Sequence, residues 1–257
     1  GKRTYAARGG GAGVDGVTLA DWSVDWPARV QALALQLRQG AYRPAPLLRT
    51  EITQRSGKVR ALAIPTVTDR VAQRAAKNVL EPVWEKIFLS CSHGFRPGHS
   101  TLTAVYQVLW YRAQGCAWAL KADIQDCFDN VAHGPLLDLV ASHADDRLVG
   151  LVAGWLRAGA CASLRGLAQG AVISPLLANI ALHPFDLAML RQGLALVRYA
   201  DDLVVMCATH EEGIRALYAV REQLSRLGLS VSPEKVAIAR FGPQLEFLGA
   251  QFRDDGA

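Results

Sequence analysis

Two adjacent carboxylates, Asp201 and Asp202, stand between short apolar runs at 194–197 and 203–206. Both runs have the length and β-branched content of strands, and Asp favours turns, so the sequence predicts that the pair lies at the tip of a β-hairpin. Neighbouring side chains can converge at a tight turn, where two anionic groups repel each other. A divalent cation removes that repulsion, and Mg²⁺ favours one or two carboxylates with substrate phosphates. An Asp-Asp pair in a solvated turn needs no cation, so metal binding requires a partner carboxylate.

A second acidic stretch supplies that partner. Asp123 lies near the end of an apolar run, 118–124, that has the character of a buried strand. Asp126 and Asp129, further along, fit helix capping or surface solvation. If the first strand of the sheet lies beside the hairpin, Asp123 can reach Asp201. Three carboxylates there could hold two Mg²⁺ ions about 3.5–4 Å apart, the arrangement used for in-line phosphoryl transfer.

The order of the remaining elements predicts the fold that brings these groups together. In the first half we expect a helix over 27–39, a hairpin over 51–64 with its turn at 55–57, a helix from Thr66 or Thr68 to about Phe88, and a helix from Ser100 to about Gln114. In the second half we expect a strand at 118–124, helices over 133–158 and 175–190, the hairpin, a helix at 211–227, and strands at 229–239 and 245–252. The second half therefore predicts an α+β fold in which a β-α-β-β-α-β order forms an antiparallel sheet.

Composition narrows the class of protein. The 257 residues, 51% of them apolar, suffice for one large or two modest globular domains. No run approaches 18 apolar residues, so no membrane span is expected. Five cysteines without a C-x-x-C pair argue against a zinc site and a disulfide framework and favour a reducing, cytoplasmic location. The chain opens on Gly1 and not on Met, so we interpret it as a fragment or a processed chain.

Positive charge is concentrated in one segment. The net charge is +5, and between residues 38 and 77 nine Lys or Arg stand against two acidic residues. Such a balance suits a polyanion, because each phosphate neutralised releases counterions. Several of these residues at helical spacing could equally form a solvated helix face.

An ordered series of short blocks carries a resemblance to a known family. The blocks are 13–18, 42–44, 60–70, 94–98, 123–128, 169–179, 199–202 and 247–249. In this order they resemble the bacterial reverse transcriptases of the group II intron lineage, and the resemblance covers nearly all of the chain. It implies RNA-directed DNA polymerase activity and a right-hand polymerase fold, with a flexible lead-in at 1–19, fingers at 20–115, a palm at 116–257 and no thumb.

The resemblance also implies roles for individual residues. Asp123, Asp201 and Asp202 match the metal-binding catalytic carboxylates, with the carbonyl of Ile124 as a further ligand. The residues matched to substrate binding are Phe128 beneath the incoming sugar, Gln169 and Gly170 in a loop on the nucleotide and template, and Arg60 with Lys58 on the triphosphate. The implied cofactor is a pair of Mg²⁺ ions, for which Mn²⁺ could substitute. The implied partners are an RNA template, a DNA or RNA primer and dNTPs.

Three departures loosen the link to an intron-encoded protein. Gln54 stands where the family usually has Lys, the loop 166–173 lacks the usual prolines, and the sequence ends shortly after Phe252 without a thumb, maturase or endonuclease region. Among domesticated relatives we favour the reverse transcriptases attached to CRISPR spacer-integration proteins. Two alternatives stay open: a non-catalytic nucleic-acid-binding module on the same sheet, which predicts exposed aromatic side chains on the central strands, and a template-independent nucleotidyl transferase.

Overall fold

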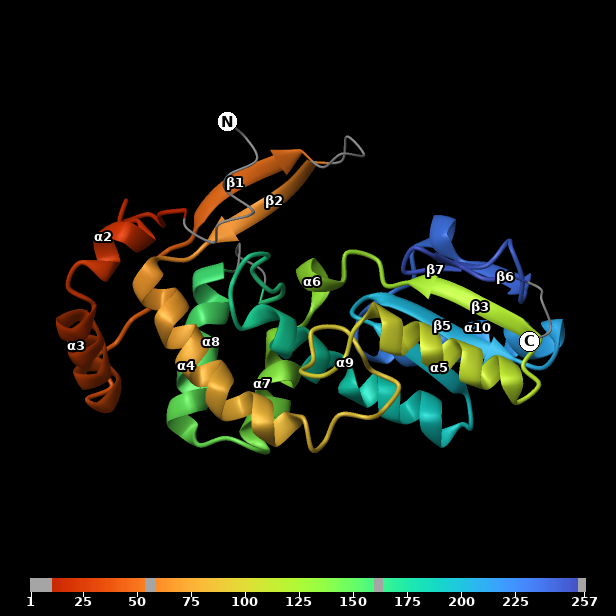
Figure 1. The fold of residues 1–257 in the computed structure, drawn as a ribbon. Helices are drawn as coiled ribbons and strands as arrows, with labels where there is room; N and C mark the ends of the chain where they lie inside the picture. The colour runs from red at the N-terminus through yellow and green to blue at the C-terminus, as the bar shows by residue number, and fades with distance from the viewer. Residues whose placement is uncertain (1–10, 54–58, 160–163, 254–257) are drawn as a thin grey trace. The chain divides into compact units, whose positions relative to one another are not determined.

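The computed structural model describes residues 11–53, 59–159 and 164–253 (Figure 1). The chain forms two compact units, each made of two segments: residues 1–83 with 133–174, and residues 84–132 with 175–257. These units differ in extent from the predicted fingers at 20–115 and palm at 116–257, and the assignment of those two functional parts stays a prediction. The lead-in predicted at 1–19 lies partly outside the described residues.

The first unit combines helices with one β-hairpin. Its elements are α2 (Leu19–Ser23), α3 (Trp26–Arg38), β1 (Leu48–Thr53), β2 (Val59–Ile64), α4 (Val67–Trp84), α7 (His133–Ala141) and α8 (Asp146–Gly159). The last residue of α4, Trp84, is counted with the second unit. The two strands pair antiparallel, with Leu48 opposite Ile64. The predicted hairpin therefore forms, although its first strand begins earlier than expected, and the predicted turn at 55–57 lies outside the described residues.

The second unit is built on a four-stranded antiparallel sheet. Its strands are β3 (Trp118–Asp123), β4 (Ala195–Tyr199), β5 (Asp202–Cys207) and β6 (Ala237–Arg240), in the spatial order β4-β5-β3-β6. The hairpin strand β5 thus lies directly beside β3, as a split β-α-β arrangement requires. The α+β class and the β-α-β-β-α-β order predicted from the sequence are confirmed.

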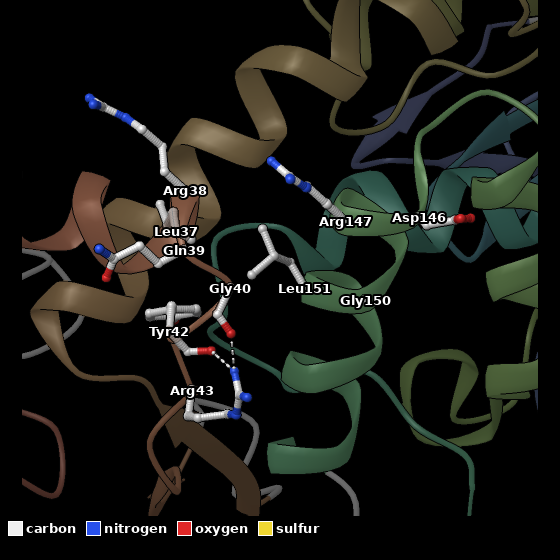
Figure 2. Close-up of a pocket in the computed structure, with 10 residues that line it drawn as sticks. All are labelled: Leu37, Arg38, Gln39, Gly40, Tyr42, Arg43, Asp146, Arg147, Gly150 and Leu151. Atoms are coloured by element: carbon white, nitrogen blue, oxygen red, sulfur yellow. Dashed lines mark hydrogen bonds between the residues drawn. The ribbon is translucent and has the colours of Figure 1, made fainter.

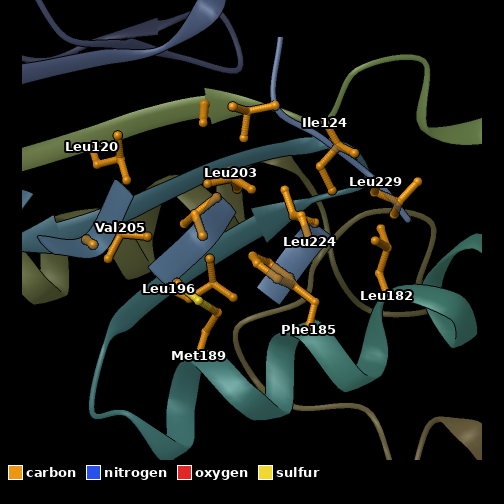
Figure 3. Packing of buried hydrophobic residues seen from close by; sticks show 14 of the residues in the cluster. Leu120, Ile124, Leu182, Phe185, Met189, Leu196, Leu203, Val205, Leu224 and Leu229 are labelled. Atoms are coloured by element: carbon orange, nitrogen blue, oxygen red, sulfur yellow. The ribbon is translucent and has the colours of Figure 1, made fainter. Parts of the chain in front are cut away.

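Helices cover both faces of this sheet. On one face, α9 (Ser174–Arg191) and α10 (His210–Arg226) pack on alternate strand residues, and Figure 3 shows Leu182, Phe185 and Met189 of α9 beneath the strands. On the other face, α5 (Thr101–Ala113) packs on the intervening strand residues, together with the short hairpin of β7 (Glu246–Phe247) and β8 (Ala250–Gln251). Because successive strand residues point to opposite faces, strand position decides which layer each side chain meets.

Some predicted element boundaries are wrong. The expected strand at 229–239 is an isolated bridge at Val231, a short 3₁₀ helix η1 (Pro233–Lys235) and then β6. Pro233 explains the break, since it has no N–H to donate to a strand partner. The expected strand at 245–252 is the β7-β8 hairpin, with Leu248 at a φ of 55° and Gly249 at 80° in its turn. None of the helices in the described part of the chain is long and apolar enough to cross a membrane.

Candidate functional site

The three predicted carboxylates meet at one edge of the four-stranded sheet. Asp123, the last residue of β3, stands directly opposite Asp202, the first residue of β5. Asp201 lies in the turn between β4 and β5, and its carbonyl accepts a hydrogen bond from the backbone nitrogen of Ile124 at 3.0 Å. Along β3, Asp123 points to the same face of the sheet as Ala119, and along β5, Asp202 points to the same face as Val204 and Met206. These three apolar residues belong to the core on the side of the sheet that α5 covers. Both carboxylates therefore lie on the α5 face.

Asp123 has partners that the sequence did not reveal. Ser232 Oγ donates to Asp123 Oδ1 at 2.9 Å, and the Ser232 backbone nitrogen donates to the Asp123 carbonyl at 2.8 Å. Lys235 Nζ lies 2.8 Å from Asp123 Oδ2, and its hydrogen bond to Asp123 raises the pKa of Lys235 above the usual lysine value although partial burial opposes that shift. The buried carboxylate of Asp123 is thus held by Ser232, which immediately precedes η1, and by Lys235, the last residue of η1.

Asp123 has a positively charged partner, whereas the surroundings of Asp202 disfavour its negative charge. Burial, followed by the negative charges of Asp201 and Asp123, raises the pKa of the Asp202 carboxyl above its usual value, and the positive charges of Lys235 and Lys121 oppose this only in part. The charged form of Asp202 is therefore disfavoured at this edge. A bound cation would relieve this effect.

The donor set fits a divalent cation in chemistry and in backbone position. Carboxylate oxygens are the ligands that Mg²⁺ prefers, and strand pairing places two of the three on the same face with the third in the adjoining turn. Within the described residues, no group of three or more His, Cys, Asp or Glu side chains is arranged to hold a metal ion. Lys235 instead pairs with Asp123, so a cation at this edge would compete with Lys235 for that carboxylate.

Phe128 follows Asp123 by five positions in the sequence and contacts a second aromatic ring. It belongs to α6 (Cys127–Asn130), whose N-cap, Asp126, has a left-handed backbone with a φ of 42°. The half-buried ring of Phe128 meets the ring of Phe95 edge-on, with centroids 6.3 Å apart and an interplanar angle of 84°. Phe95 is 45% exposed and has a φ of 62°, a conformation that is rare for a bulky residue and occurs at functional sites.

Three of the predicted substrate-binding residues, Arg60, Gln169 and Gly170, lie in the first unit, whereas Phe128 lies in the second. The Ala63 backbone nitrogen of β2 donates to the Gln169 carbonyl at 2.9 Å, so the loop containing Gln169 and Gly170 runs beside the strand that carries Arg60. Gly170 has a φ of 115°, and a Cβ there would press on the Ala63 carbonyl oxygen, which explains the glycine. The structure describes the backbone of Arg60 and not its side chain, and Lys58 lies outside the described residues.

A cavity of about 400 Å³ in the first unit has a basic rim (Figure 2). Its lining includes Arg38, Arg43 and Arg147, with one acidic residue, Asp146. Arg43 Nη1 donates to the carbonyls of Gly40 at 2.7 Å and Tyr42 at 2.8 Å, which fixes its guanidinium within the wall. None of the residues predicted as catalytic or substrate-binding lines this cavity.

Comparison with known proteins gives one family and several relatives. A family described as "Reverse transcriptase (RNA-dependent DNA polymerase)" matches residues 52–252. The group II intron-encoded protein LtrA of Lactococcus lactis subsp. cremoris is 36% identical over 166 residues, which are 62% of this chain and 28% of LtrA. The chain therefore spans less than a third of the length of that curated relative.

Two solved structures are also similar. A telomerase from Candida tropicalis, in complex with a fragment of telomeric RNA, has a TM-score of 0.60 and 12% identity, and the match covers 88% of this chain and 47% of the telomerase chain. This likeness supports the fold. A chain of a partial Cas6-RT-Cas1–Cas2 complex is 31% identical, with a TM-score of 0.44, and the match covers 78% of this chain and 36% of that one.

Proposed function

Because this chain belongs to the reverse transcriptase family, we propose that it catalyses RNA-directed DNA synthesis at the edge of the sheet where Asp123 faces Asp202. The observation that supports this is the register of β3 and β5, which sets two carboxylates opposite each other with Asp201 in the adjoining turn. Phosphoryl-transfer enzymes bind divalent cations with carboxylates of this kind, whose negative charges repel one another when no cation is bound.

The proposed cofactor is a pair of Mg²⁺ ions, with Mn²⁺ as a substitute. Enzymes of this family depend on divalent cations in general, and here Asp123, Asp201, Asp202 and the Ile124 carbonyl would hold them. When bound, such ions lower the barrier to attack by a primer 3′-hydroxyl and support the departing pyrophosphate. Lys235, which pairs with Asp123 in the absence of cations, would release this carboxylate to them.

The proposed substrates are an RNA template, a DNA or RNA primer and dNTPs. Phe128 would pack beneath the sugar of the incoming nucleotide, while Gln169 and Gly170 would contact nucleotide and template. Arg60 would bind the triphosphate, since its guanidinium offers phosphate a two-pronged contact, and Lys58 would assist it. A partnership with CRISPR spacer-integration proteins rests on the resemblance of the sequence alone.

Primer extension tests this proposal. The purified chain is supplied with an RNA or a DNA homopolymer template, a matched primer and one dNTP, in Mg²⁺ or in EDTA, with Asp201→Asn as the inactive control. Extension that needs the template, Mg²⁺ and Asp201 is the expected result. Addition without a template would identify a nucleotidyl transferase, and duplex binding without extension would identify a binding module.

The arrangement of the central strands argues against the binding module. That alternative predicts exposed aromatic rings on β3 and β5. The aromatic residue of β3 is Trp118, which is half-buried with its ring centroid 5.0 Å from that of His210, and β5 has no aromatic residue. The open ends of these strands carry carboxylates, which repel nucleic-acid phosphates unless cations intervene.

A further inference from the structure

A fully buried ion pair lies behind the carboxylate turn. Arg198, near the end of β4, binds Asp186 of α9 through two contacts, Nε to Oδ1 at 2.7 Å and Nη2 to Oδ2 at 2.5 Å. Both side chains have no exposed surface. Removing two charges from water is costly, and apolar residues of similar volume would fill this position without that penalty. The pair therefore calls for an explanation beyond stability.

The remaining donors of Arg198 reach the structures around the turn. Nη1 donates to the carbonyl of Ala200 at 2.9 Å and to Asn179 Oδ1 at 3.1 Å, and Nη2 donates to Ser92 Oγ at 2.8 Å. Ala200 immediately precedes Asp201. One guanidinium thus fastens the turn to α9 and to the segment that contains Ser92.

The backbone of Arg198 is fixed to the same segment. Its N–H donates to the Cys91 carbonyl at 2.7 Å, and its carbonyl accepts from the His93 N–H at 2.8 Å. Ser92 forms a parallel bridge with Arg198, so residues 91–93 act as a short strand against β4. The backbone and the side chain of Arg198 are therefore both held.

Gly94 supports the turn from the other side. A Cβ at Gly94 would overlap the backbone nitrogen of Ala200, so only glycine permits this approach. Asn179 Nδ2 donates to the Gly94 carbonyl at 2.7 Å, which links Gly94 to the residue that also accepts from Arg198. Ala200 has a φ of 57°, an unfavourable conformation for a residue with a side chain, and these surrounding contacts hold it there.

The Arg198 side chain and the Asp202 carboxylate lie on opposite faces of the sheet. Arg198 points to the same face as Leu196, towards α9, whereas Asp202 points towards α5. The guanidinium donors are occupied by Asp186, Asn179, Ser92 and Ala200. Arg198 therefore acts on Asp201 and Asp202 through the backbone of the turn and not by touching a substrate.

We propose that Arg198, paired with Asp186, is a positioning residue that holds Asp201 and Asp202 in the geometry that binds divalent cations. The proposal rests on the proposed function, since it assigns cation binding to these carboxylates. Residues that orient metal ligands commonly change metal affinity by about 10–100-fold when they are replaced. We expect a loss of about tenfold here, the lower end of that range, because the turn retains Gly94 and its strand pairing.

The test uses a double variant that leaves no buried charge unpaired. Arg198→Met with Asp186→Leu removes both charges, so the protein is expected to fold. The control is Arg226→Met with Glu222→Leu, which removes an exposed ion pair of 2.7 Å on α10.

A second variant, Gly94→Ala, displaces the turn directly. Its control is Gly134→Ala, because a Cβ at Gly134 meets no atom within 4 Å. Mn²⁺ affinity is measured by electron paramagnetic resonance of the free ion, and folding by thermal unfolding in EDTA.

Each outcome decides the proposal. Mn²⁺ binding about tenfold weaker in both test variants, with unchanged binding in both controls, supports the positioning role. A folded double variant that binds Mn²⁺ as the wild type does overturns it. If the double variant does not fold, unchanged Mn²⁺ affinity in Gly94→Ala still overturns the proposal, because the position of the turn would then not govern cation binding. A wild-type chain that binds no Mn²⁺ and extends no primer overturns this proposal together with the proposed function.

Discussion

Replacing two facing carboxylates by amides is expected to change stability in opposite directions. Asp123→Asn removes the negative partner of Lys235, while Asp202→Asn removes an anion whose pKa is raised by burial and by two neighbouring carboxylates. The first change loses an attraction and the second relieves a repulsion. Both variants are nevertheless expected to lose Mg²⁺-dependent primer extension, because each removes a proposed metal ligand.

The magnitudes follow from exposure and pairing. The Lys235 side chain is 52% exposed, so solvent screens its ion pair and Asp123→Asn should cost about 1 kcal/mol of unfolding free energy. Like charges directly opposite on paired strands destabilise by a similar or smaller amount, so Asp202→Asn should gain about 0.2–1 kcal/mol. For a chain of this length, 1 kcal/mol corresponds to a Tm shift of about 2–4 °C.

The assay is calorimetric unfolding in EDTA at pH 7, with Glu246→Gln, which removes an exposed carboxylate of the same unit, as the control. Because the pKa of Asp202 is raised in the folded protein, its carboxyl is protonated there at a higher pH than in the unfolded chain. The gain in unfolding free energy from Asp202→Asn should therefore be full at pH 7 and disappear as the pH falls towards the ordinary Asp pKa of about 3.9. If Asp123→Asn unfolds later than the wild type, the stabilising role of the Lys235–Asp123 pair is refuted. If Asp202→Asn unfolds earlier, the unfavourable charge at Asp202 is refuted.

Three further predictions concern substrates. Phe128→Val should raise ribonucleotide incorporation relative to deoxyribonucleotide incorporation in single-nucleotide extension, because a smaller side chain leaves room for the 2′-hydroxyl; a stability loss of about 1–3 kcal/mol with unchanged selectivity would make Phe128 a packing residue. Arg60→Ala should raise the apparent KM for dNTP in steady-state extension and leave primer-template affinity unchanged. Weaker primer-template binding with an unchanged KM for dNTP would refute the assignment of Arg60 to the triphosphate. Primer-template affinity, measured by fluorescence anisotropy between 50 and 200 mM salt, should fall steeply as salt rises, since Lys and Arg contacts to phosphate release counterions. A flat dependence would contradict phosphate binding by the basic segment 38–77.

The sheet that carries the carboxylates was predictable because its signals are local. Each strand of the β3, β4 and β5 set is a short apolar run, and the order of helices and strands restricts how the sheet can be arranged. From that order alone the first strand lies beside the hairpin. The predicted meeting of Asp123 with Asp201 and Asp202 follows from this topology.

The groups that support the carboxylates were not predictable, because their contacts are long-range. Ser232 and Asp123 are separated by 109 positions, and Ser92 and Arg198 by 106. No periodicity connects such pairs, and an Arg beside a turn resembles a solvated residue in the sequence. A signal existed at Gly94, since glycine permits a close backbone approach, but the sequence does not identify Ala200 as the partner.

The pairing of Asp123 with Asp202 makes the site sensitive to changes in chain length. Because side chains alternate along a strand, one residue inserted or deleted within β3 would turn the carboxylate of Asp123 to the α9 face. A two-residue insertion would restore the face but move the carboxylate by about 7 Å along the strand, beyond the reach of Asp201. The connection at 114–117, whose Gly115 has a φ of 98° with no atom within 4 Å of a Cβ, can absorb added residues without shifting this register. Variation in length among related chains should therefore collect before Trp118 and be excluded between Trp118 and Asp123.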